Sequence, residues 1–293
     1  MDFARILVQL DPDKHASVFD AVVAIDSGID HLLQMSDVQP DAVRGLVHGA
    51  MFTRGPNDLK NTAVFIGGSN VEKGEQILQE VRQAFFGPIR CSVMFDGNGA
   101  NTTAVAAVLA AARHIDLSGA DCIVLGGTGP VGQRVARLLL GQGATVALGS
   151  RELSKAEETC QSLRKRVGSQ VAARLRPLAQ RAEDVDVALS SAIALFSCGA
   201  AGVELVQSHQ LNAATQLRVA IDLNAVPPSG IAGIDATDKA MPRQARVDYG
   251  AMGVGGLKMK IHREAVRRLF TQNDLVLDAE EILEIGQALL SAK

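Results

Sequence analysis

The chain has 293 residues, of which 47% are hydrophobic and 21% are charged. The length indicates two domains, and the composition excludes a disordered or low-complexity chain. A formal net charge of -3 leaves no basic surplus that would favour binding to nucleic acid or to an anionic membrane. We therefore expect a globular protein whose partners are neither nucleic acids nor membranes.

The cysteines and the amino terminus bear on whether the chain holds disulfides or a metal and on where it is located. The chain has no C-x-x-C pair, and its four cysteines are Cys91, Cys122, Cys160 and Cys198. We therefore expect neither a disulfide framework nor a metal site. The first, second and fourth stand in apolar runs that are typical of buried thiols. Residues 1–5 do not resemble a signal peptide, the apolar run 104–112 is too short to span a bilayer, and a cytoplasmic location is expected.

The N-terminal part of the chain alternates strands and helices. Strands are expected at 5–11, 63–68 and 91–95, and helices at 17–28, 40–51, 71–86 and 104–114. Ser17 and Asp20 are spaced as a variant capping box for the first helix. Between the last strand and the last helix lies a polar turn, 96–103. This part predicts a small α/β unit.

The second part repeats the alternation. Strands are expected at 122–125, 145–148, 193–197 and 218–223, and helices at 130–140, 153–167, 257–270 and 279–290, with a loop-rich region at 226–256. This spacing predicts parallel strands with right-handed crossovers. We expect a Rossmann-type doubly wound parallel sheet domain over 104–256. A smaller α/β substrate domain, 1–103, would be completed by the C-terminal helices within 257–293, leaving a cleft between the two domains.

The strongest single motif is a glycine-rich turn between a predicted strand and a predicted helix. Gly127, Gly129 and Gly132 form G-x-G-x-x-G there. Gly127 would permit the tight turn, Gly129 would let a pyrophosphate approach the backbone, and Gly132 would let the helix pack against the strand. The helix amides would then face the phosphates. The flanking strand and helix favour a dinucleotide site over an ordinary glycine turn, with Thr128, Pro130 and Val131 as further contacts.

The end of the next strand bears on which dinucleotide binds. Gly149-Ser150-Arg151 stands where an NAD enzyme usually has an acidic residue, and the first carboxylate is Glu152. Ser150 can donate to a 2′-phosphate, and Arg151 can form charge-assisted hydrogen bonds with it. NADP is therefore favoured. The alternative is that Arg151 is only a solvated residue at the helix start, in which case NAD could bind comparably.

The predicted helix 257–270 carries an apolar stripe made of Leu257, Ile261, Ala265 and Leu269. At about 100° per residue, Lys258 lies on this stripe and His262 beside it, whereas Lys260 lies opposite and should be solvated. A lysine on a packed face is costly unless it meets a cleft or a partner. The alternative is a snorkelling lysine and a core histidine. The glycine-rich run 250–256, which would let a ligand or another chain approach, favours a functional site.

Two polar clusters remain. The turn 96–103 offers donors and acceptors for a heterocycle, or else is a solvated turn in which Asn101 or Thr102 caps the next helix. The segment 222–228 follows a strand that should end near the nicotinamide, so Asn224 is a candidate cofactor contact, unless the loop is only a rigid turn.

Several stretches together resemble a known family. They are SVFDAVVAIDSGIDH (17–31), FFGP (85–88), DGNGANTT (96–103), GGTGPVG (126–132), DLNAVPPSGIAGIDATDK (222–239) and GVGGLKMKIHR (253–263). Through nearly its whole length the chain resembles the NAD(P)-dependent methylene-tetrahydromethanopterin dehydrogenases of bacterial one-carbon metabolism. Its two-domain plan is more distantly similar to that of the methylene-tetrahydrofolate dehydrogenases.

The resemblance implies a pterin-side domain, a dinucleotide domain and a homo-oligomer, with a trimer suspected. It implies that Phe19, Thr103, Lys258 and His262 are active-site residues. Phe19 on its own is typical of a helical core residue. The candidate substrate-binding side chains are Asp20, Asp96, Asn98, Asn101 and Thr102. The family includes NADP-specific members and members that accept both nucleotides, so NAD is a possible second cofactor.

The implied reaction passes a hydride from the methylene carbon of the reduced pterin carrier to NADP, giving a methenyl cation, in the oxidation of one-carbon units from formaldehyde. No nucleophile or metal is required. Lys258 would hold pterin heteroatoms, because a positive charge close to a developing cation is unfavourable. His262 would orient Lys258 or the substrate, Phe19 would pack on the pterin, and Thr103 would hydrogen-bond to it. The alternatives are a methylene-tetrahydrofolate dehydrogenase and a non-catalytic NADP-binding sensor.

Overall fold

The computed structural model describes residues 3–292. The chain divides into two compact units. The first unit holds residues 1–102 and 259–293, and the second holds residues 103–258. The chain enters the second unit after residue 102, one residue before the boundary expected from the sequence. It returns to the first unit after residue 258, two residues beyond the expected boundary.

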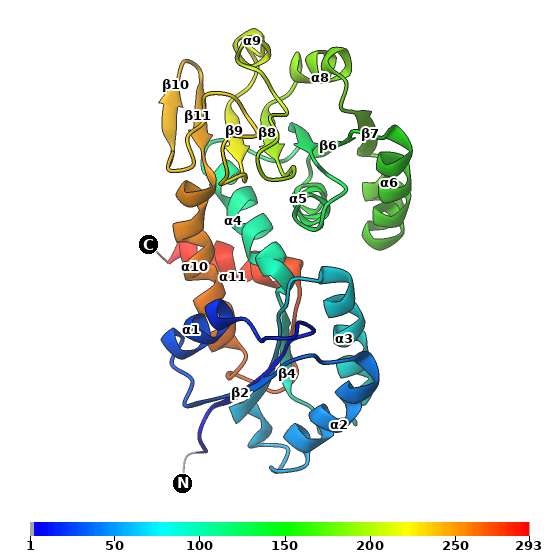
Figure 1. Ribbon diagram of the computed structural model, residues 1–293, viewed down its shortest axis with the longest axis vertical. Coiled ribbons are helices and arrows are strands. Elements are labelled where there is room, and N and C mark those ends of the chain that lie inside the picture. Colours follow the sequence, from blue (N-terminus) through cyan, green and yellow to red (C-terminus); the bar gives the residue numbers. More distant parts are fainter. Residues whose placement is uncertain (1–2, 293) are drawn as a thin grey trace. The chain divides into compact units, whose positions relative to one another are not determined.

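The first unit is built on a parallel sheet with the strand order β12-β4-β3-β1-β2, and Figure 1 labels β2 and β4 of this sheet. Its strands are β1 (Ile6–Leu10), β2 (His31–Met35), β3 (Thr62–Ile66), β4 (Ser92–Phe95) and β12 (Val276–Leu277). Strands β3 and β4 are buried throughout, as central parallel strands are when both faces are covered. The helices that lie wholly in this unit are α1 (Val18–Asp26), α2 (Pro40–Met51), α3 (Val71–Ala84) and α11 (Ala279–Ser291).

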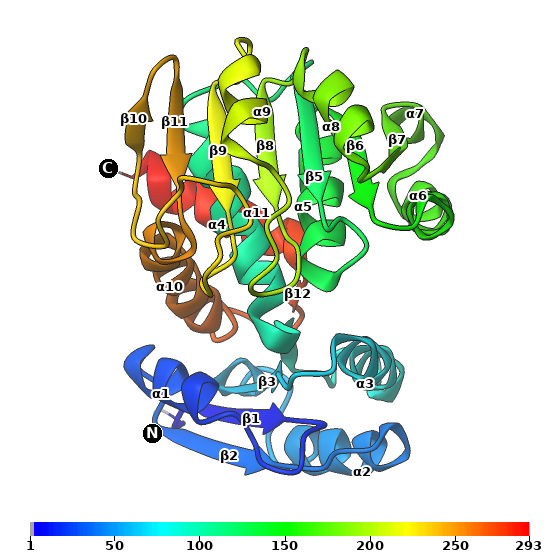
Figure 2. The ribbon, with the colours of Figure 1, turned by 45° about the horizontal axis from the view of Figure 1, so that its top comes forward.

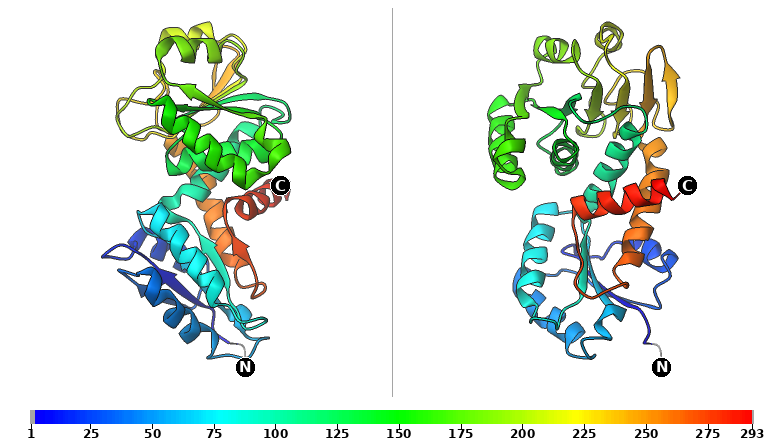
Figure 3. Two further views of the ribbon diagram at one scale, coloured as in Figure 1. Left: turned by 90° about the vertical axis from the view of Figure 1, so that its right-hand side faces the viewer. Right: turned by 180° about the vertical axis from the view of Figure 1, so that it is seen from behind.

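Local capping fixes where the first and last of these helices begin. The hydroxyl of Ser17 accepts a hydrogen bond from the Asp20 amide at 3.2 Å. Asp278 and Glu281 form a reciprocal capping box for α11. Because β12 pairs with β4, the last residues of the chain complete the first unit, as the orange-to-red segment in Figure 3 shows.

The second unit carries a sheet with the order β10-β11-β9-β8-β5-β6-β7, which Figure 2 shows from one side to the other. Its strands are β5 (Asp121–Leu125), β6 (Thr145–Ser150), β7 (Leu175–Ala179), β8 (Ala194–Ser197), β9 (Val219–Asp222), β10 (Met241–Arg243) and β11 (Arg246–Tyr249). All neighbours pair in parallel except β10 and β11. From β5 the chain proceeds to β6 and β7 on one side and to β8, β9 and β11 on the other, so the expected Rossmann-type doubly wound fold is confirmed.

Helices cover this sheet, and the chain also crosses between the units inside two helices. The helices within the second unit are α5 (Pro130–Gly141), α6 (Leu153–Val167), α7 (Ser169–Ala172), α8 (Ala182–Leu189) and α9 (Ser208–Ala213). The crossing helices are α4 (Ala100–Ala112) and α10 (Ala251–Arg268). Among residues 3–292, no helix combines the length and the apolar character needed to cross a membrane.

Both crossing helices begin earlier than the sequence predicted. Helix α4 starts at Ala100, so half of the expected polar turn is α-helical, and a 3-10 helix, Gly97–Gly99, precedes it. Helix α10 starts at Ala251 and takes in most of the glycine-rich run that we expected to be a loop. At Gly250 and Gly253, an added Cβ would collide with the carbonyl oxygens of Asp235 and Asp238. These two glycines therefore serve close packing inside the second unit rather than leaving an opening for a ligand.

Candidate functional site

A glycine turn joins β5 to α5 in the second unit. Gly126 has a φ of +65°, and a Cβ there would lie 2.6 Å from the Cα of Gly199. A Cβ on Gly132 would lie 2.7 Å from the Gly126 oxygen, and one on Gly127 would lie 2.5 Å from the side chain of Leu148. The tight turn therefore falls on Gly126, one residue before the position expected, while Gly132 allows the helix to pack as predicted.

Gly129 differs from the other glycines of this turn. The nearest atom to a Cβ added there is the Gly126 oxygen at 3.5 Å, an ordinary contact. Packing of the protein therefore does not require glycine at this position. Since Gly129 also lines a cavity, its missing side chain leaves the backbone open to whatever occupies that cavity.

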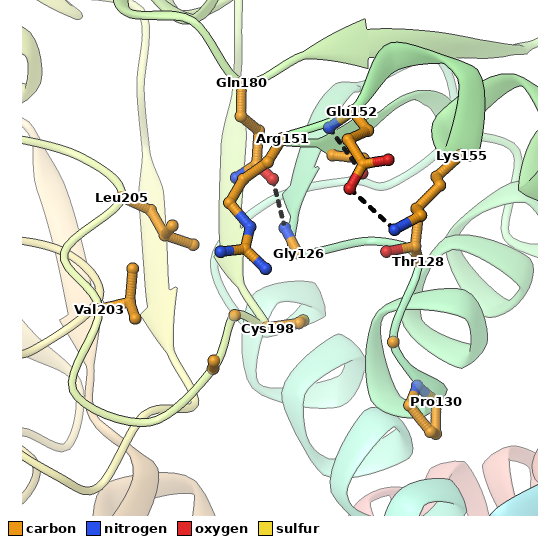
Figure 4. A pocket seen from close by; sticks show the side chains of 14 residues that line it. Gly126, Thr128, Pro130, Arg151, Glu152, Lys155, Gln180, Cys198, Val203 and Leu205 are labelled. Atoms are coloured by element: carbon orange, nitrogen blue, oxygen red, sulfur yellow. Dashed lines mark hydrogen bonds and ion pairs between the residues drawn. The ribbon is translucent and has the colours of Figure 1, made fainter.

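The cavity has a volume of about 420 Å³ and lies at the carboxyl ends of the strands of the second unit (Figure 4). Gly126 follows β5 and Cys198 follows β8, so the cavity includes the point where the strand order reverses, where doubly wound sheets bind ligands. Five of the expected cofactor residues line it: Thr128, Gly129, Pro130, Ser150 and Arg151. Gly127, Val131, Gly132 and Asn224 do not line it. The residues that sequence reasoning missed include Gly126, Glu152, Lys155, Gln180, Cys198 and Leu205.

One rim of the cavity is charged. Ser150 ends β6, Arg151 follows it, and Glu152 stands at the N-cap of α6. The Nζ of Lys155, one turn later, lies 2.8 Å from the Oε1 of Glu152. The hydrogen bond from Lys155, with the positive charges of Lys155 and Arg151, lowers the pKa of Glu152. Two cations and one carboxylate thus face the same cavity.

Gln180 supplies a donor that the protein leaves unused. Its Oε1 accepts a long hydrogen bond, 3.4 Å, from the amide of Gly126 (Figure 4). Its Nε2 is buried and has no hydrogen-bond partner among residues 3–292. A buried donor without a partner costs about 1–3 kcal/mol. Together with the glycine turn and the two cations, this spare donor fits a ligand rich in acceptor oxygens and nitrogens, as a dinucleotide is.

The thiol in the cavity wall has a raised pKa. Cys198 is only half-buried as a residue, in contrast to the buried position expected. Burial of its thiol, with the charge of Asp222 nearby, raises its pKa to about 12. Burial likewise raises the pKa values of Cys91 and Cys122 to about 12 and that of Cys160 to about 11.

Asn224 has a local role in the loop after β9. Its Oδ1 accepts from the amide of Val226, and its Nδ2 donates to the oxygen of Pro228, both at 3.0 Å. Asp222 fixes the same loop by accepting from the amides of Asn224 and Ile231. With its side chain buried and engaged in this way, Asn224 is better described by the alternative of a rigid turn than as a cofactor contact.

In the first unit, three of the expected substrate contacts are buried. Asp96, Asn101 and Thr102 are each 0% exposed. The Asp96 carboxylate accepts from the amides of Asn101 and Thr102 and, at 2.6 Å, from the Thr102 hydroxyl. It therefore caps the start of α4. Their burial does not favour the expected contact with a ligand, and Asp96 rather than Asn101 or Thr102 is the capping residue.

His262 joins this buried cluster. Its Nδ1 lies 3.6 Å from Oδ2 of Asp96, and its ring stacks on Phe65 with 5.6 Å between centroids. His262 is 1% exposed. The neighbours of His262 on the helix lie as the spacing of about 100° per residue predicts, because Ile261 is buried and Lys260 is exposed. Lys258, one turn earlier on α10, is partly buried.

The strand order of the first sheet also has a reversal, between β1 and β3. Asp11 follows β1, and its carboxylate accepts from the amides of Asp13 and Ser17, both at 2.9 Å. Gly67 follows β3, and a Cβ there would lie 2.9 Å from Oδ2 of Asp20. The carboxylate of Asp20 therefore lies at the carboxyl edge of this sheet, where a ligand is expected in this fold.

The remaining predicted site residues are partly or fully exposed to solvent. Phe19 on α1 is 53% exposed, which contradicts its expected place in a helical core. Asn98 is exposed and has a φ of +52°. Thr103 on α4 is partly buried.

Comparison with known proteins places the chain in a family. Residues 18–98 match the family described as methylene-tetrahydromethanopterin dehydrogenase, N-terminal. The NAD(P)-dependent methylenetetrahydromethanopterin dehydrogenase of Methylorubrum extorquens strain AM1 is 34% identical over 293 residues, covering 96% of this chain and 97% of that protein. This chain belongs to the methylene-tetrahydromethanopterin dehydrogenase family. The bifunctional protein MdtA of the same strain is 42% identical over 286 residues, covering 97% of this chain and 98% of that protein.

A solved structure supports the fold of this family member at low sequence identity. The ligand-free 5-ketofructose reductase of Gluconobacter sp. strain CHM43 superposes with a TM-score of 0.55 and 13% identity, covering 98% of this chain and 99% of that one. This similarity concerns the fold and not the substrate.

Proposed function

We propose that this chain is an oxidoreductase that transfers a hydride from methylene-tetrahydromethanopterin to NADP and produces methenyl-tetrahydromethanopterin. NAD is the second choice of cofactor. The observation that carries the proposal is the cavity at the strand reversal of a doubly wound sheet, with an open Gly129 and with Ser150 and Arg151 on its rim, in a chain of this family.

The preference for NADP rests on the end of β6. A hydroxyl and a guanidinium line the cavity there as Ser150 and Arg151. Both can donate to a 2′-phosphate, and a planar guanidinium suits phosphate oxygens. The amides at the start of α5 supply further donors for a pyrophosphate.

On the substrate side we assign the pterin carrier to the carboxyl edge of the first sheet. Asp20 lies at that edge, and the side chain of Asn98 is exposed. Thr102 donates to Asp96, and the Asn101 side chain donates to the oxygen of Phe95 and to Asp278. The exposed ring of Phe19 offers an apolar face to a pterin. Thr103 would donate or accept a hydrogen bond.

The two functional residues of α10 act by positioning. A nucleotide held by the residues of the cavity would supply the acceptor for a hydride from the methylene carbon, and the product would be a methenyl cation. Lys258 would hold pterin heteroatoms away from that cation, because two positive charges repel at close range. His262, held between Phe65 and Asp96, would keep Lys258 or the substrate in place. Orientation of this kind can contribute about 7–11 kcal/mol to catalysis.

A spectrophotometric assay tests the proposal. The purified protein is mixed with methylene-tetrahydromethanopterin and either NADP or NAD, and formation of the reduced nicotinamide is followed. Reduction is expected with NADP, and more slowly with NAD. Methylene-tetrahydrofolate is assayed in parallel, and faster turnover with it would indicate a tetrahydrofolate enzyme. Nucleotide binding without reduction of any pterin would indicate a sensor and would refute the proposed activity.

The oligomeric state and the cellular location are proposed from the resemblance to the family. We infer a homo-oligomer, with a trimer as the specific expectation, in the cytoplasm. Sedimentation of the purified protein measures the number of subunits directly.

A further inference from the structure

The rim of the nucleotide cavity carries an ion pair that the NADP assignment above does not use. Glu152 and Lys155 both line the cavity, with 2.8 Å between the Nζ of Lys155 and the Oε1 of Glu152. The side chains are 63% and 59% exposed, respectively. Exposed pairs of this kind contribute little to stability, so replacing one partner with another costs little free energy.

The local fold places this pair at the adenosine end of the site. Ser150 is the last residue of β6, and Glu152 and Lys155 are three residues apart at the start of α6, so their side chains lie on one face of the helix. In doubly wound folds the ribose of the adenosine is bound just beyond this second strand.

We propose that the Glu152–Lys155 pair sets the choice between NADP and NAD, an inference that rests on the proposed function. With NADP, the 2′-phosphate replaces Glu152 as the partner of Lys155, and Arg151 is the second cation that holds it. With NAD, the pair stays closed, and the second carboxylate oxygen of Glu152 accepts a hydrogen bond from the ribose 2′-hydroxyl.

The chemistry of the three groups supports this exchange. An ionised carboxylate only accepts hydrogen bonds, so Glu152 can bind a hydroxyl but repels a phosphate. Lys155 and Arg151 only donate and therefore favour the phosphate. A rim that carries both kinds of group can hold either nucleotide, and the balance of charge decides which one is preferred.

Calorimetric titration with two adenosine fragments tests the inference without any turnover. The fragment 2′,5′-ADP carries the distinguishing phosphate, and 5′-ADP lacks it. The variants are Lys155→Met and Glu152→Gln. The matched controls are Lys165→Met and Glu158→Gln, which make the same charge changes at exposed positions on the same helix.

Lys155→Met is expected to weaken 2′,5′-ADP binding about tenfold, while 5′-ADP binding stays within about twofold. Glu152→Gln is expected to tighten 2′,5′-ADP binding about threefold, the size of one exposed ion pair, and not to tighten 5′-ADP binding. Both control variants should bind the two fragments with the affinities of the unaltered protein. If Lys155→Met binds 2′,5′-ADP as well as the unaltered protein does, the pair has no role in the choice and the inference is wrong. If the unaltered protein binds neither fragment nor NADP, the proposed function itself fails.

Discussion

The carboxylate of Asp96 faces the imidazole of His262, with 3.6 Å between Oδ2 and Nδ1. The same carboxylate caps α4 through Asn101 and Thr102. One buried acid thus connects the start of α4 with a histidine on α10. Because both groups are buried, changes at Asp96 should be felt at His262 as well as in stability.

Asp96→Asn tests this connection. The amide keeps the shape but replaces an acceptor oxygen with a donor, so charge-assisted hydrogen bonds are lost, at a cost of about 1.5–3 kcal/mol. We expect lower stability in urea and a lower kcat, with unchanged affinity for NADP. Thr102→Val is the control, since it removes the hydrogen bonds of the Thr102 hydroxyl but leaves the charge facing His262. Equal losses of kcat in both variants would show that the capping of α4, and not the contact with His262, matters for turnover.

Lys258→Ala is expected to retain NADP binding and to lose about a hundredfold in kcat/KM, a loss typical of a misplaced reacting centre. The exposed neighbour Lys260 on the same helix provides the control as Lys260→Ala, which should be silent. Undiminished kcat/KM in Lys258→Ala would remove Lys258 from the mechanism.

Arg151→Ala is expected to raise the KM for NADP about tenfold, the contribution of one charge-assisted contact. The KM for NAD should change little, because NAD lacks the phosphate that Arg151 would bind. Steady-state kinetics with each nucleotide measures both. An equal rise for NADP and NAD would mean that Arg151 does not recognise the 2′-phosphate.

Two glycines of the β5–α5 turn should respond differently to alanine. In Gly132→Ala the new Cβ would meet the Gly126 oxygen at 2.7 Å, and overpacking of this kind costs about 1–3 kcal/mol. In Gly129→Ala the nearest contact is 3.5 Å, so stability should be kept while nucleotide affinity falls. Thermal unfolding and calorimetric titration separate the two effects. Normal NADP binding by Gly129→Ala would contradict the proposed approach of the pyrophosphate.

Tyr249 offers a pH-dependent signal, because it is the only tyrosine in a chain without tryptophan. Burial raises its pKa, although Arg113 opposes the shift, and its hydroxyl lies 2.8 Å from Nε2 of His114. The unfolded chain should lose the phenolic proton at lower pH than the folded chain. Stability should therefore fall as pH rises above the ordinary tyrosine pKa of about 10. Tyrosinate absorbance should appear at higher pH in buffer than in urea; coincident titrations would refute the shift.

The sequence predicted most of the fold because regular elements carry strong periodic patterns. The helices α3 and α11 show this, since each starts at the residue expected. The strand β7 was not predicted, because Arg176 and Pro177 are unusual in a strand and are tolerated here at the edge of a sheet. The early start of α10 was missed because glycine indicates a loop, whereas Gly250 and Gly253 are required by close packing.

The candidate site was less predictable than the fold. Ser150 and Arg151 could be placed because Ser150 ends a strand and Arg151 follows it directly. Gln180 could not, since it reaches the cavity through the sheet pairing of β7 with β6, which no local pattern reveals. Asp96 illustrates the opposite case: polar side chains in a turn indicate a binding site, yet Asp96 and Thr102 bond to each other and both are buried.

The protected thiols have a practical consequence. All four cysteines lie within the described residues, and burial raises the pKa of each thiol. Alkylating reagents act on the thiolate, so the natural thiols should react slowly at neutral pH. A single substitution on an exposed helix face, such as Glu158→Cys, would then accept one fluorescent or spin label. Such site-selective labelling would allow nucleotide binding to be followed by spectroscopy without first removing any natural cysteine.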